Sequence, residues 1–264
     1  MSMISLSKPA RVVEREENRA VFEVEELYPG YGVTIGNSVR RVLLSSLDGA
    51  AVTRVKIKGV PHEFSTISGM QEDVIGLLLN IKQVCVKLHG SEAQKGMLSV
   101  RGDKEVKAGD IEFPSQVELI NKDLVLCRLT DKKAELEMEV FVEPGVGYAP
   151  VVASKKEKED IGTIALDAIF TPVVKVNYTV EQMRVGDRTD FDKLRVEVVT
   201  DGTLSPEEAF QKALSILIDE LAVVKSGVEG AIPSAQEAEE TEEPSPKKKK
   251  TKAVKAVKAA KKKA

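Results

Sequence analysis

The sequence predicts an α+β fold in which both chain ends build one domain and a β-rich segment is inserted between them. A strand pair and a helix open the chain, a mostly β segment follows, and another strand pair and a long helix close the folded part. Because whole domains can be inserted at exposed turns, we expect a discontinuous domain of residues 1–50 and 169–232 around an insert domain of residues 51–168. Residues 233–264 form a separate tail.

The opening elements are a hairpin and an amphipathic helix. β-branched and alternating residues predict strands at Ala10–Glu14 and Ala20–Glu25. Apolar residues at helical spacing predict a helix from about Thr34 to Leu47, with Thr34 able to cap its start and Gly49 past its end.

The middle segment alternates apolar and polar residues, which is typical of strands with one buried face. One helix interrupts it at about Met70–Lys82, and two further strands, Val173–Val180 and Leu194–Val199, follow it. The strands predicted within the segment are Val52–Lys58, Val84–Leu88, Met97–Arg101, Val117–Ile120, Leu124–Leu129 and Ala134–Val142.

The closing helix has a clear start signal in Ser205–Glu208, where an N-cap serine precedes a proline and a glutamate lies three residues after the cap. We expect it to run to about Lys225. Its apolar surface is broad enough for burial on two sides, one on its own sheet and one on a second copy of the chain. The alternative is a helix buried in a single core. The predicted dimer contacts are Phe210, Leu214, Leu217, Ile218 and Leu221.

Composition excludes several classes of protein. The 264 residues are 42% hydrophobic and 31% charged, as in an ordinary soluble globular protein. No apolar run approaches the roughly 20 residues that span a bilayer, and the start lacks the apolar core of a secretory signal. We therefore expect a cytoplasmic protein without membrane contact. Two cysteines, Cys85 and Cys127, and two histidines predict buried thiols and no structural zinc site.

The net charge of −3 hides an uneven distribution. The tail from Pro233 carries ten lysines and five glutamates, so it is basic, whereas the rest of the chain is acidic. An acidic body is a poor general binder of nucleic acid, since affinity for phosphates depends on accumulated Lys and Arg. The tail has too few apolar residues to bury a core, and we expect it to be disordered when free.

Three stretches suggest chemistry but favour structural roles. The glycines Gly30, Gly32 and Gly36 precede a helix, yet their spacing is not that of a dinucleotide-binding loop and no Walker-type motif occurs, so turn geometry is favoured. His62 has Glu63 and Ser65 beside it, but sequence neighbours do not make a catalytic triad. The carboxylates in Arg188–Leu194 suggest either a metal site or, as favoured here, a surface turn with local ion pairs.

Arg40 and Arg41 lie inside an otherwise apolar helix. Unpaired charges are costly to bury, so these side chains either extend to the surface or meet a partner. Arginine is enriched at protein interfaces, because its planar guanidinium donates paired hydrogen bonds. The pair therefore suggests a subunit interface.

Several long motifs, read together, closely resemble one family, the alpha subunit of bacterial DNA-directed RNA polymerase. They occur in the family's order with similar spacing, and the match covers about residues 5–230. The motifs are GYGVTIGNSVRRVLLSS (Gly30–Ser46), HEFSTISGMQED (His62–Asp73), LLNIK (Leu78–Lys82), GVGYAP (Gly145–Pro150), RTDFDKL (Arg188–Leu194) and DGTLSPEEA (Asp201–Ala209).

The resemblance implies a non-catalytic scaffold inside a nucleotidyltransferase complex. In the family, a dimerisation domain made from both chain ends carries an insert domain, and the alpha homodimer initiates assembly with the beta and beta-prime subunits. Arg41 and Leu44 match positions used toward beta, with Arg40 beside them. Lys82 and Leu166 match positions linked to beta-prime. The resemblance implies no catalytic residue, metal ligand or cofactor in this chain.

The tail departs from the family, which usually continues into a small helical domain that binds promoter DNA and activators. We hypothesise that the lysines of the tail attract DNA without reading its sequence; the alternative is a solubilising tail. These lysines are Lys247, Lys248, Lys249, Lys250, Lys252, Lys255, Lys258, Lys261, Lys262 and Lys263. Two other functions stay open: an alpha-like scaffold of another complex, and a nucleotide-binding enzyme that uses the glycine turn.

Overall fold

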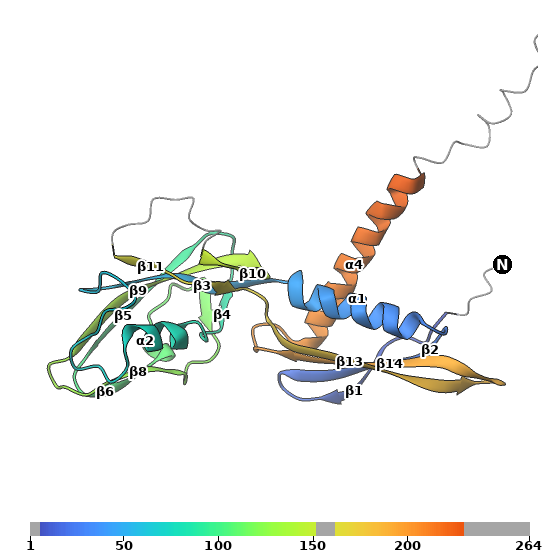
Figure 1. The fold of residues 1–264 in the computed structure, drawn as a ribbon, viewed down its shortest axis with the longest axis horizontal. Coiled ribbons are helices and arrows are strands. Elements are labelled where there is room, and N and C mark those ends of the chain that lie inside the picture. Colours follow the sequence, from blue (N-terminus) through green and yellow to red (C-terminus); the bar gives the residue numbers. More distant parts are fainter. Residues whose placement is uncertain (1–5, 152–161, 230–264) are drawn as a thin grey trace, which may run out of the picture. The chain divides into compact units, whose positions relative to one another are not determined.

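The computed structural model describes residues 6–151 and 162–229. It is a mixed structure of helices and antiparallel sheets, which confirms the predicted α+β class (Figure 1). Two compact units divide the chain between Glu220 and Leu221, inside the last helix. The first unit contains every sheet of the described structure, and the described part of the second is the end of that helix.

The first sheet joins the two ends of the folded chain. Its order is β1-β2-β14-β13, and all neighbours are antiparallel. The strands are β1 (Arg11–Arg15), β2 (Arg19–Leu27), β13 (Val173–Val185) and β14 (Arg188–Thr200). Because β2 lies directly beside β14, segments more than 160 residues apart share one ladder, as Figure 1 shows by the blue and orange strands.

Helix α1 (Tyr31–Ser45) and the first half of helix α4 (Pro206–Glu229) pack against this sheet. Helix α1 packs on β13 and β14. Helix α4 has 24 residues, about 36 Å at 1.5 Å per residue. The ring of Phe210 stacks on that of Phe22 in β2, with centroids 4.2 Å apart. The core between helices and sheet is apolar and includes Leu43, Leu47, Leu194 and Val196.

The second sheet belongs to the middle of the chain and has the order β11-β3-β9-β5. Alternate residues of its strands bury one face against α2 (Val74–Ile81) and shorter strand pairs, in a separate apolar core. The elements of the middle segment are β3 (Asp48–Ile57), β4 (Val86–Leu88), β5 (Gln94–Arg101), β6 (Lys104–Lys107), η1 (Ala108–Asp110), β7 (Val117–Leu119), β8 (Val125–Leu129), β9 (Glu135–Val146), β10 (Tyr148–Ala149), β11 (Thr163–Ala165) and β12 (Ala168–Ile169).

Helix boundaries differ from the sequence expectation at two starts. Helix α1 begins at Tyr31, and the hydroxyl of Thr34 donates to the carbonyl of Gly30, so the predicted Thr34 cap is wrong. Helix α2 begins at Val74 instead of about Met70, because Met70 forms a β-bridge with Leu129 and the Asp73 carboxylate caps the amide of Gly76 at 2.7 Å. The bridge between Met70 and Leu129 is distant in sequence, whereas the Asp73 cap is local to the start of α2.

The start of α4 follows its sequence signal. The Ser205 hydroxyl accepts from the amide of Glu208 at 3.3 Å, and the Glu208 carboxylate accepts from the amide of Ser205 at 3.4 Å. This reciprocal pair is the predicted capping box. The short strands β6, β10, β11 and β12 were not predicted, because two to four residues carry no readable alternation.

In the described residues no helix is both long and apolar enough to cross a membrane.

Candidate subunit interface

Asp192 of β14 fixes the start of α1. Gly30 occupies the N-cap with a left-handed backbone (φ 87°) and has no side chain that could cap the helix. One carboxylate oxygen of Asp192 accepts from the amides of Gly30 at 2.9 Å and Gly32 at 3.0 Å. A carboxylate at this place satisfies free N–H groups and complements the positive end of the helix dipole. The helix amides that a phosphate would use are therefore occupied by the protein itself.

The other two glycines of the motif lie inside α1, against the sheet. A Cβ on Gly32 would lie 2.8 Å from the Val180 side chain, and one on Gly36 would lie 2.7 Å from Tyr178 and 2.9 Å from Leu194. These distances are shorter than real Cβ contacts, so both positions require glycine for close packing. The expectation of a structural role is confirmed, although only Gly30 serves the turn itself.

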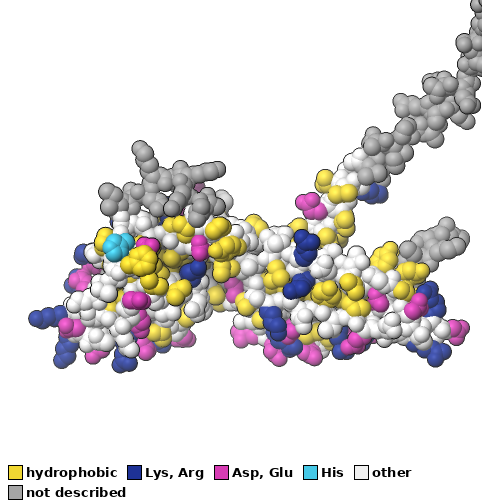
Figure 2. Space-filling model, viewed as in Figure 1, with side chains coloured by type: hydrophobic (Ala, Val, Ile, Leu, Met, Phe, Trp, Pro, Cys, Tyr) yellow, Lys and Arg dark blue, Asp and Glu magenta, His cyan; other side chains and the backbone are white. Residues whose placement is uncertain are grey.

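The opposite face of α1 carries the predicted beta-facing residues. Arg40 and Arg41 are exposed, and Leu44 is 37% exposed, whereas Val39 and Leu43 are buried. Because residues three and four apart share a helix face, the three side chains form one patch, which we call the α1 patch: Arg40, Arg41 and Leu44. Figure 2 shows hydrophobic and basic side chains side by side in the region of α1.

The arginines of the α1 patch have no partner among the described residues: neither guanidinium makes an ion pair or a side-chain hydrogen bond there. Their donors are therefore available to another molecule. Sequence reasoning missed two exposed residues, Val33 and Asn37, which extend the same face toward the helix start. Asn37 lies four residues before Arg41, and Val33 lies seven residues before Arg40. This helical spacing was the signal that could have found them.

The structure brings the two predicted beta-prime residues together. Lys82 is the C-cap residue of α2, and Leu166 follows β11, yet both line one cavity of about 470 Å³. A cation at a helix C-terminus is favoured by the helix dipole. Three exposed apolar side chains, Phe64, Ile75 and Leu79, line the same cavity. We call this region the Lys82 cavity.

Asp167 organises the polar edge of the Lys82 cavity, and sequence reasoning did not single it out. Its carboxylate accepts from the amide of Val151 at 2.9 Å and lies 3.7 Å from the Lys82 ammonium, and the Tyr148 side chain contributes to its electrostatic environment. The Val151 hydrogen bond, then the charge of Lys82, hold the pKa of Asp167 below its ordinary value. No sequence pattern links these residues, because they come from three separate segments, around 82, 148–151 and 167.

The predicted dimer contacts on α4 divide into two groups. Phe210 is 7% exposed and is enclosed by its own chain, and Leu214 and Leu217 are half-buried against the same core. Ile218 is 63% exposed and Leu221 is 60% exposed. Val223 and Val224, which were not among the predicted contacts, are exposed to a similar degree. The second half of α4 therefore presents several large apolar side chains to solvent.

The residues considered for metal binding or catalysis have structural partners. Asp190 forms a two-point ion pair with Arg188 at 3.0 and 2.7 Å, while Asp192 caps α1. His62 lies 3.2 Å from the Ser65 hydroxyl in an exposed turn. Within residues 6–151 and 162–229, no three His, Cys, Asp or Glu side chains are grouped as metal ligands would be.

Both cysteines are free thiols. Burial raises the pKa of Cys127 to about 12 and that of Cys85 to about 11. Neither is therefore a thiolate at neutral pH, as a reactive cysteine would be. Cys127 is fully buried, as predicted, and Cys85 is half-buried.

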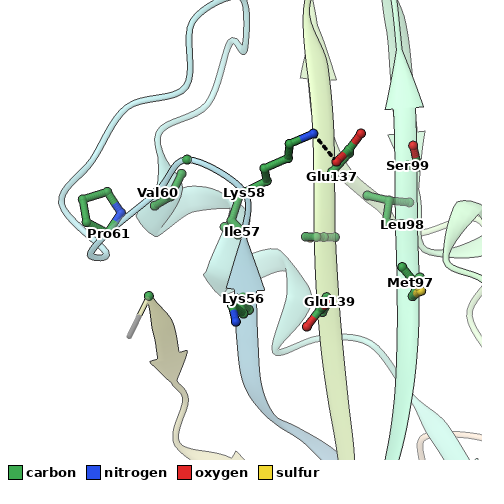
Figure 3. A pocket seen from close by; sticks show the side chains of 13 residues that line it. Lys56, Ile57, Lys58, Val60, Pro61, Met97, Leu98, Ser99, Glu137 and Glu139 are labelled. Atoms are coloured by element: carbon green, nitrogen blue, oxygen red, sulfur yellow. Dashed lines mark hydrogen bonds and ion pairs between the residues drawn. The ribbon is translucent and has the colours of Figure 1, made fainter. Parts of the chain in front are cut away.

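A cavity of about 880 Å³ lies over β3, β9 and β5 (Figure 3). Lys58 donates to Glu137 at 2.6 Å, and Glu139 pairs with Lys95 at 2.7 Å, so the acidic strand β9 is neutralised by its neighbours. Paired charges on a sheet surface stabilise the ladder. This arrangement favours a structural role for these charges over acid–base chemistry.

The lysines of the proposed DNA-attracting tail lie outside the described residues.

Comparison with known proteins gives the same family across most of the chain. Residues 55–171 match a family model described as the RNA polymerase Rpb3/RpoA insert domain. A relative from Roseiflexus castenholzii is 49% identical over 217 residues, which are 82% of this chain and 67% of the relative. A relative from Carboxydothermus hydrogenoformans is 47% identical over 220 residues, 83% of this chain and 70% of the relative.

A third relative, from Symbiobacterium thermophilum, is 47% identical over 232 residues, 87% of this chain and 73% of the relative. All three carry the name DNA-directed RNA polymerase subunit alpha. Identity near one half over four fifths of the chain, together with the insert-domain match, shows that this chain belongs to the family of DNA-directed RNA polymerase alpha subunits.

Proposed function

We propose that this chain is the non-catalytic alpha subunit that homodimerises and scaffolds assembly of the beta and beta-prime subunits for DNA-templated transcription. The observation that carries the proposal is the α1 patch, which presents two arginines without a partner beside an exposed leucine on a helix whose other face is buried. Arginine with adjacent apolar surface is typical of residues that dominate subunit interfaces.

The α1 patch is the proposed contact for beta. Asp192 and the close packing of Gly32 and Gly36 hold α1 rigidly on the sheet, so the patch is pre-organised. A rigid site loses less conformational entropy on binding than a flexible one. Two guanidinium groups without competing internal partners favour carboxylates or carbonyls of the partner.

The Lys82 cavity is the proposed contact for beta-prime. Lys82 and Leu166 meet there from different elements, and exposed apolar side chains surround them. An apolar cavity with the Lys82 ammonium at its edge suits an apolar segment of beta-prime that also carries a hydrogen-bond acceptor.

The exposed half of α4 is the proposed dimer surface. Ile218 and Leu221 supply its apolar area, while Leu214 and Leu217 lie at the border with the protomer's own core. Phe210, already enclosed by its own chain, supports the helix instead of contacting the second copy directly. The proposed discontinuous domain of residues 1–50 and 169–232 would then form the dimer, with 51–168 as insert.

The proposed site of action is the cytoplasm, where transcription in bacteria takes place. Catalysis of nucleotidyl transfer would belong to the large subunits.

The experiment is an affinity pull-down of the tagged chain from its native cells, with stoichiometric partners identified by mass. Two very large subunits with two copies of this chain support the proposal. Recovery of the homodimer alone, or of unrelated partners, would show that family membership does not give the function here. Arg41→Ala should weaken capture of beta selectively, about tenfold or more, as truncation of an interface anchor does.

The matched control is Arg11→Ala. Arg11 is exposed on β1 and, in the described structure, has no ion pair, so the same loss of charge occurs away from the α1 patch. Equal effects of the two substitutions would indicate a general charge effect instead of a beta contact.

The lysine tail is proposed to attract DNA non-specifically. The support is its composition, ten lysines within residues 247–264. Each phosphate contact contributes about 0.9 to the slope of log affinity against log salt concentration. Deletion of residues 247–264 should therefore reduce this slope for promoter-fragment binding by the assembled enzyme. An unchanged slope would favour the solubilising alternative.

A further inference from the structure

Asp167 is placed so that its carboxylate meets two different donors at the edge of the Lys82 cavity. The Val151 amide donates to one carboxylate oxygen at 2.9 Å, and the Lys82 ammonium lies 3.7 Å from the other. The Val151 amide fixes the carboxylate, because a hydrogen bond from the backbone leaves it little freedom to rotate. The carboxylate is therefore a fixed negative charge beside a flexible cation.

Lys82 differs from the other members of the group, because its contact is the longest and its side chain has many rotamers. A free lysine side chain loses rotamer entropy when it is ordered. An ammonium has three N–H donors, and at 3.7 Å from Asp167 it keeps donors for another acceptor. Pairing with a fixed carboxylate narrows the range of directions in which the ammonium extends.

We propose that Asp167 is a positioning residue for beta-prime capture: it holds the Lys82 ammonium at the rim of the cavity, oriented for an acceptor on beta-prime. This inference rests on the proposed function, in which Lys82 contacts beta-prime. Asp167 itself contacts no partner; its effect passes through Lys82. The Val151 amide holds the carboxylate and does not touch the ammonium in any described contact.

The test is a double-mutant cycle with purified beta and beta-prime subunits of the same organism. The dissociation constant for beta-prime is measured with preassembled alpha–beta complexes that carry Lys82→Ala, Asp167→Asn or both. Asparagine keeps an oxygen that can accept from the Val151 amide but removes the charge that attracts Lys82. Asp167→Asn should weaken capture about two- to fivefold at low salt, which corresponds to about 0.4–1 kcal/mol and lies in the range of ion pairs near the surface.

Coupling is the decisive readout. With Lys82→Ala already present, Asp167→Asn should change the dissociation constant for beta-prime by less than about 1.5-fold, since the ammonium through which Asp167 acts is then absent. Raising the salt concentration should also shrink the effect of Asp167→Asn in the parent chain, because exposed charges are screened.

Tyr148→Phe is the control for a purely structural role. It removes the hydroxyl that interacts with Asp167 but leaves the ion pair with Lys82, so capture should stay within about 1.5-fold of the parent. If Tyr148→Phe weakens capture as much as Asp167→Asn does, Asp167 acts by holding the local backbone and the positioning role is wrong.

The possible failures are separable. If Lys82→Ala leaves beta-prime capture unchanged, the proposed beta-prime contact is wrong and the positioning role falls with it. If Lys82→Ala weakens capture but Asp167→Asn has no effect, or has the same effect with and without Lys82, only the positioning role is overturned.

Discussion

Asp192 and Gly32 are joined by a 3.0 Å hydrogen bond from the glycine amide to the carboxylate, although 160 residues separate them. The same oxygen accepts from the amide of Gly30. A Cβ on Gly32 would lie 3.0 Å from the Cβ of Asp192 and 3.0 Å from this oxygen. Helix α1 is thus fixed at its start by the second half of the chain. The α1 patch depends for its position on this long-range cap.

Asp192→Ala should lower the free energy of unfolding by about 1–3 kcal/mol, because it removes a helix cap and leaves buried amides unsatisfied. Asp192→Asn, which keeps one acceptor oxygen, should cost less than Asp192→Ala. Urea unfolding followed by circular dichroism measures both.

Asp190→Ala is the matched control for this cap. Asp190 pairs with Arg188 at the surface, so its loss should change stability by less than about 0.5 kcal/mol. Equal costs for Asp190→Ala and Asp192→Ala would show that the cap contributes nothing to stability.

Gly36→Ala should destabilise the protein by about 1–3 kcal/mol despite the better helix propensity of alanine. The added Cβ would meet the Tyr178 ring at 2.7 Å and the buried Leu194 at 2.9 Å. Gly227, in α4, has nothing within 4 Å of its ideal Cβ. Gly227→Ala should therefore be neutral or stabilising by up to about 1 kcal/mol.

Thermal unfolding of the two glycine variants measures the difference. No loss of stability for Gly36→Ala would mean that α1 can shift on the sheet without cost, and that the glycine motif is not required for close packing.

Local sequence signals predicted most of the helices and strands but not the long-range contacts between them. The capping box at Ser205 and the alternation in β9 can be read from neighbouring residues, and both occur as predicted. The start of α1 could not be read this way, because its cap comes from Asp192. Met70 likewise lies at helical spacing with its neighbours but pairs with Leu129.

The candidate interface shows the same limit. Resemblance to a family supplied Lys82 and Leu166 as separate positions, and the structure gives them a common cavity. Asp167 was missed, because its importance comes from contacts with Lys82, Tyr148 and Val151 that no periodicity encodes. Exposure also could not be read for α4, where periodicity alone does not separate the enclosed Phe210 from the exposed Ile218.

Glu23 predicts a pH-dependent part of stability. Its nearly buried carboxylate lies 2.9 Å from the Lys193 ammonium and 2.8 Å from the Arg195 guanidinium. Hydrogen bonds from Lys193 and then Arg195 hold the pKa of Glu23 below its ordinary value. A lowered folded-state pKa stabilises the fold above the unfolded pKa of about 4.3, and this stabilisation is lost as pH falls through the folded-state pKa.

Glu23→Gln should therefore be less stable than the parent at pH 7, and the difference should narrow below about pH 4.3. Urea unfolding at several pH values between 7 and 3 measures this. Glu17→Gln is the control, since Glu17 is exposed and, in the described structure, has no ion pair. A constant difference between Glu23→Gln and the parent across this pH range would show that Glu23 does not contribute through its charge.

Ile218→Asp should weaken the proposed dimer at least about 100-fold, because a dimer contact would bury the new charge without a partner. The monomer fold should be little affected, since Ile218 is 63% exposed within its own chain. Sedimentation over a range of protein concentrations measures the dissociation constant, and circular dichroism checks the fold. Glu220→Ala is the control, because position 220 lies about 200° around the helix from Ile218. An unchanged dissociation constant for Ile218→Asp would mean that this side of α4 faces solvent or another subunit, and that the two copies meet elsewhere.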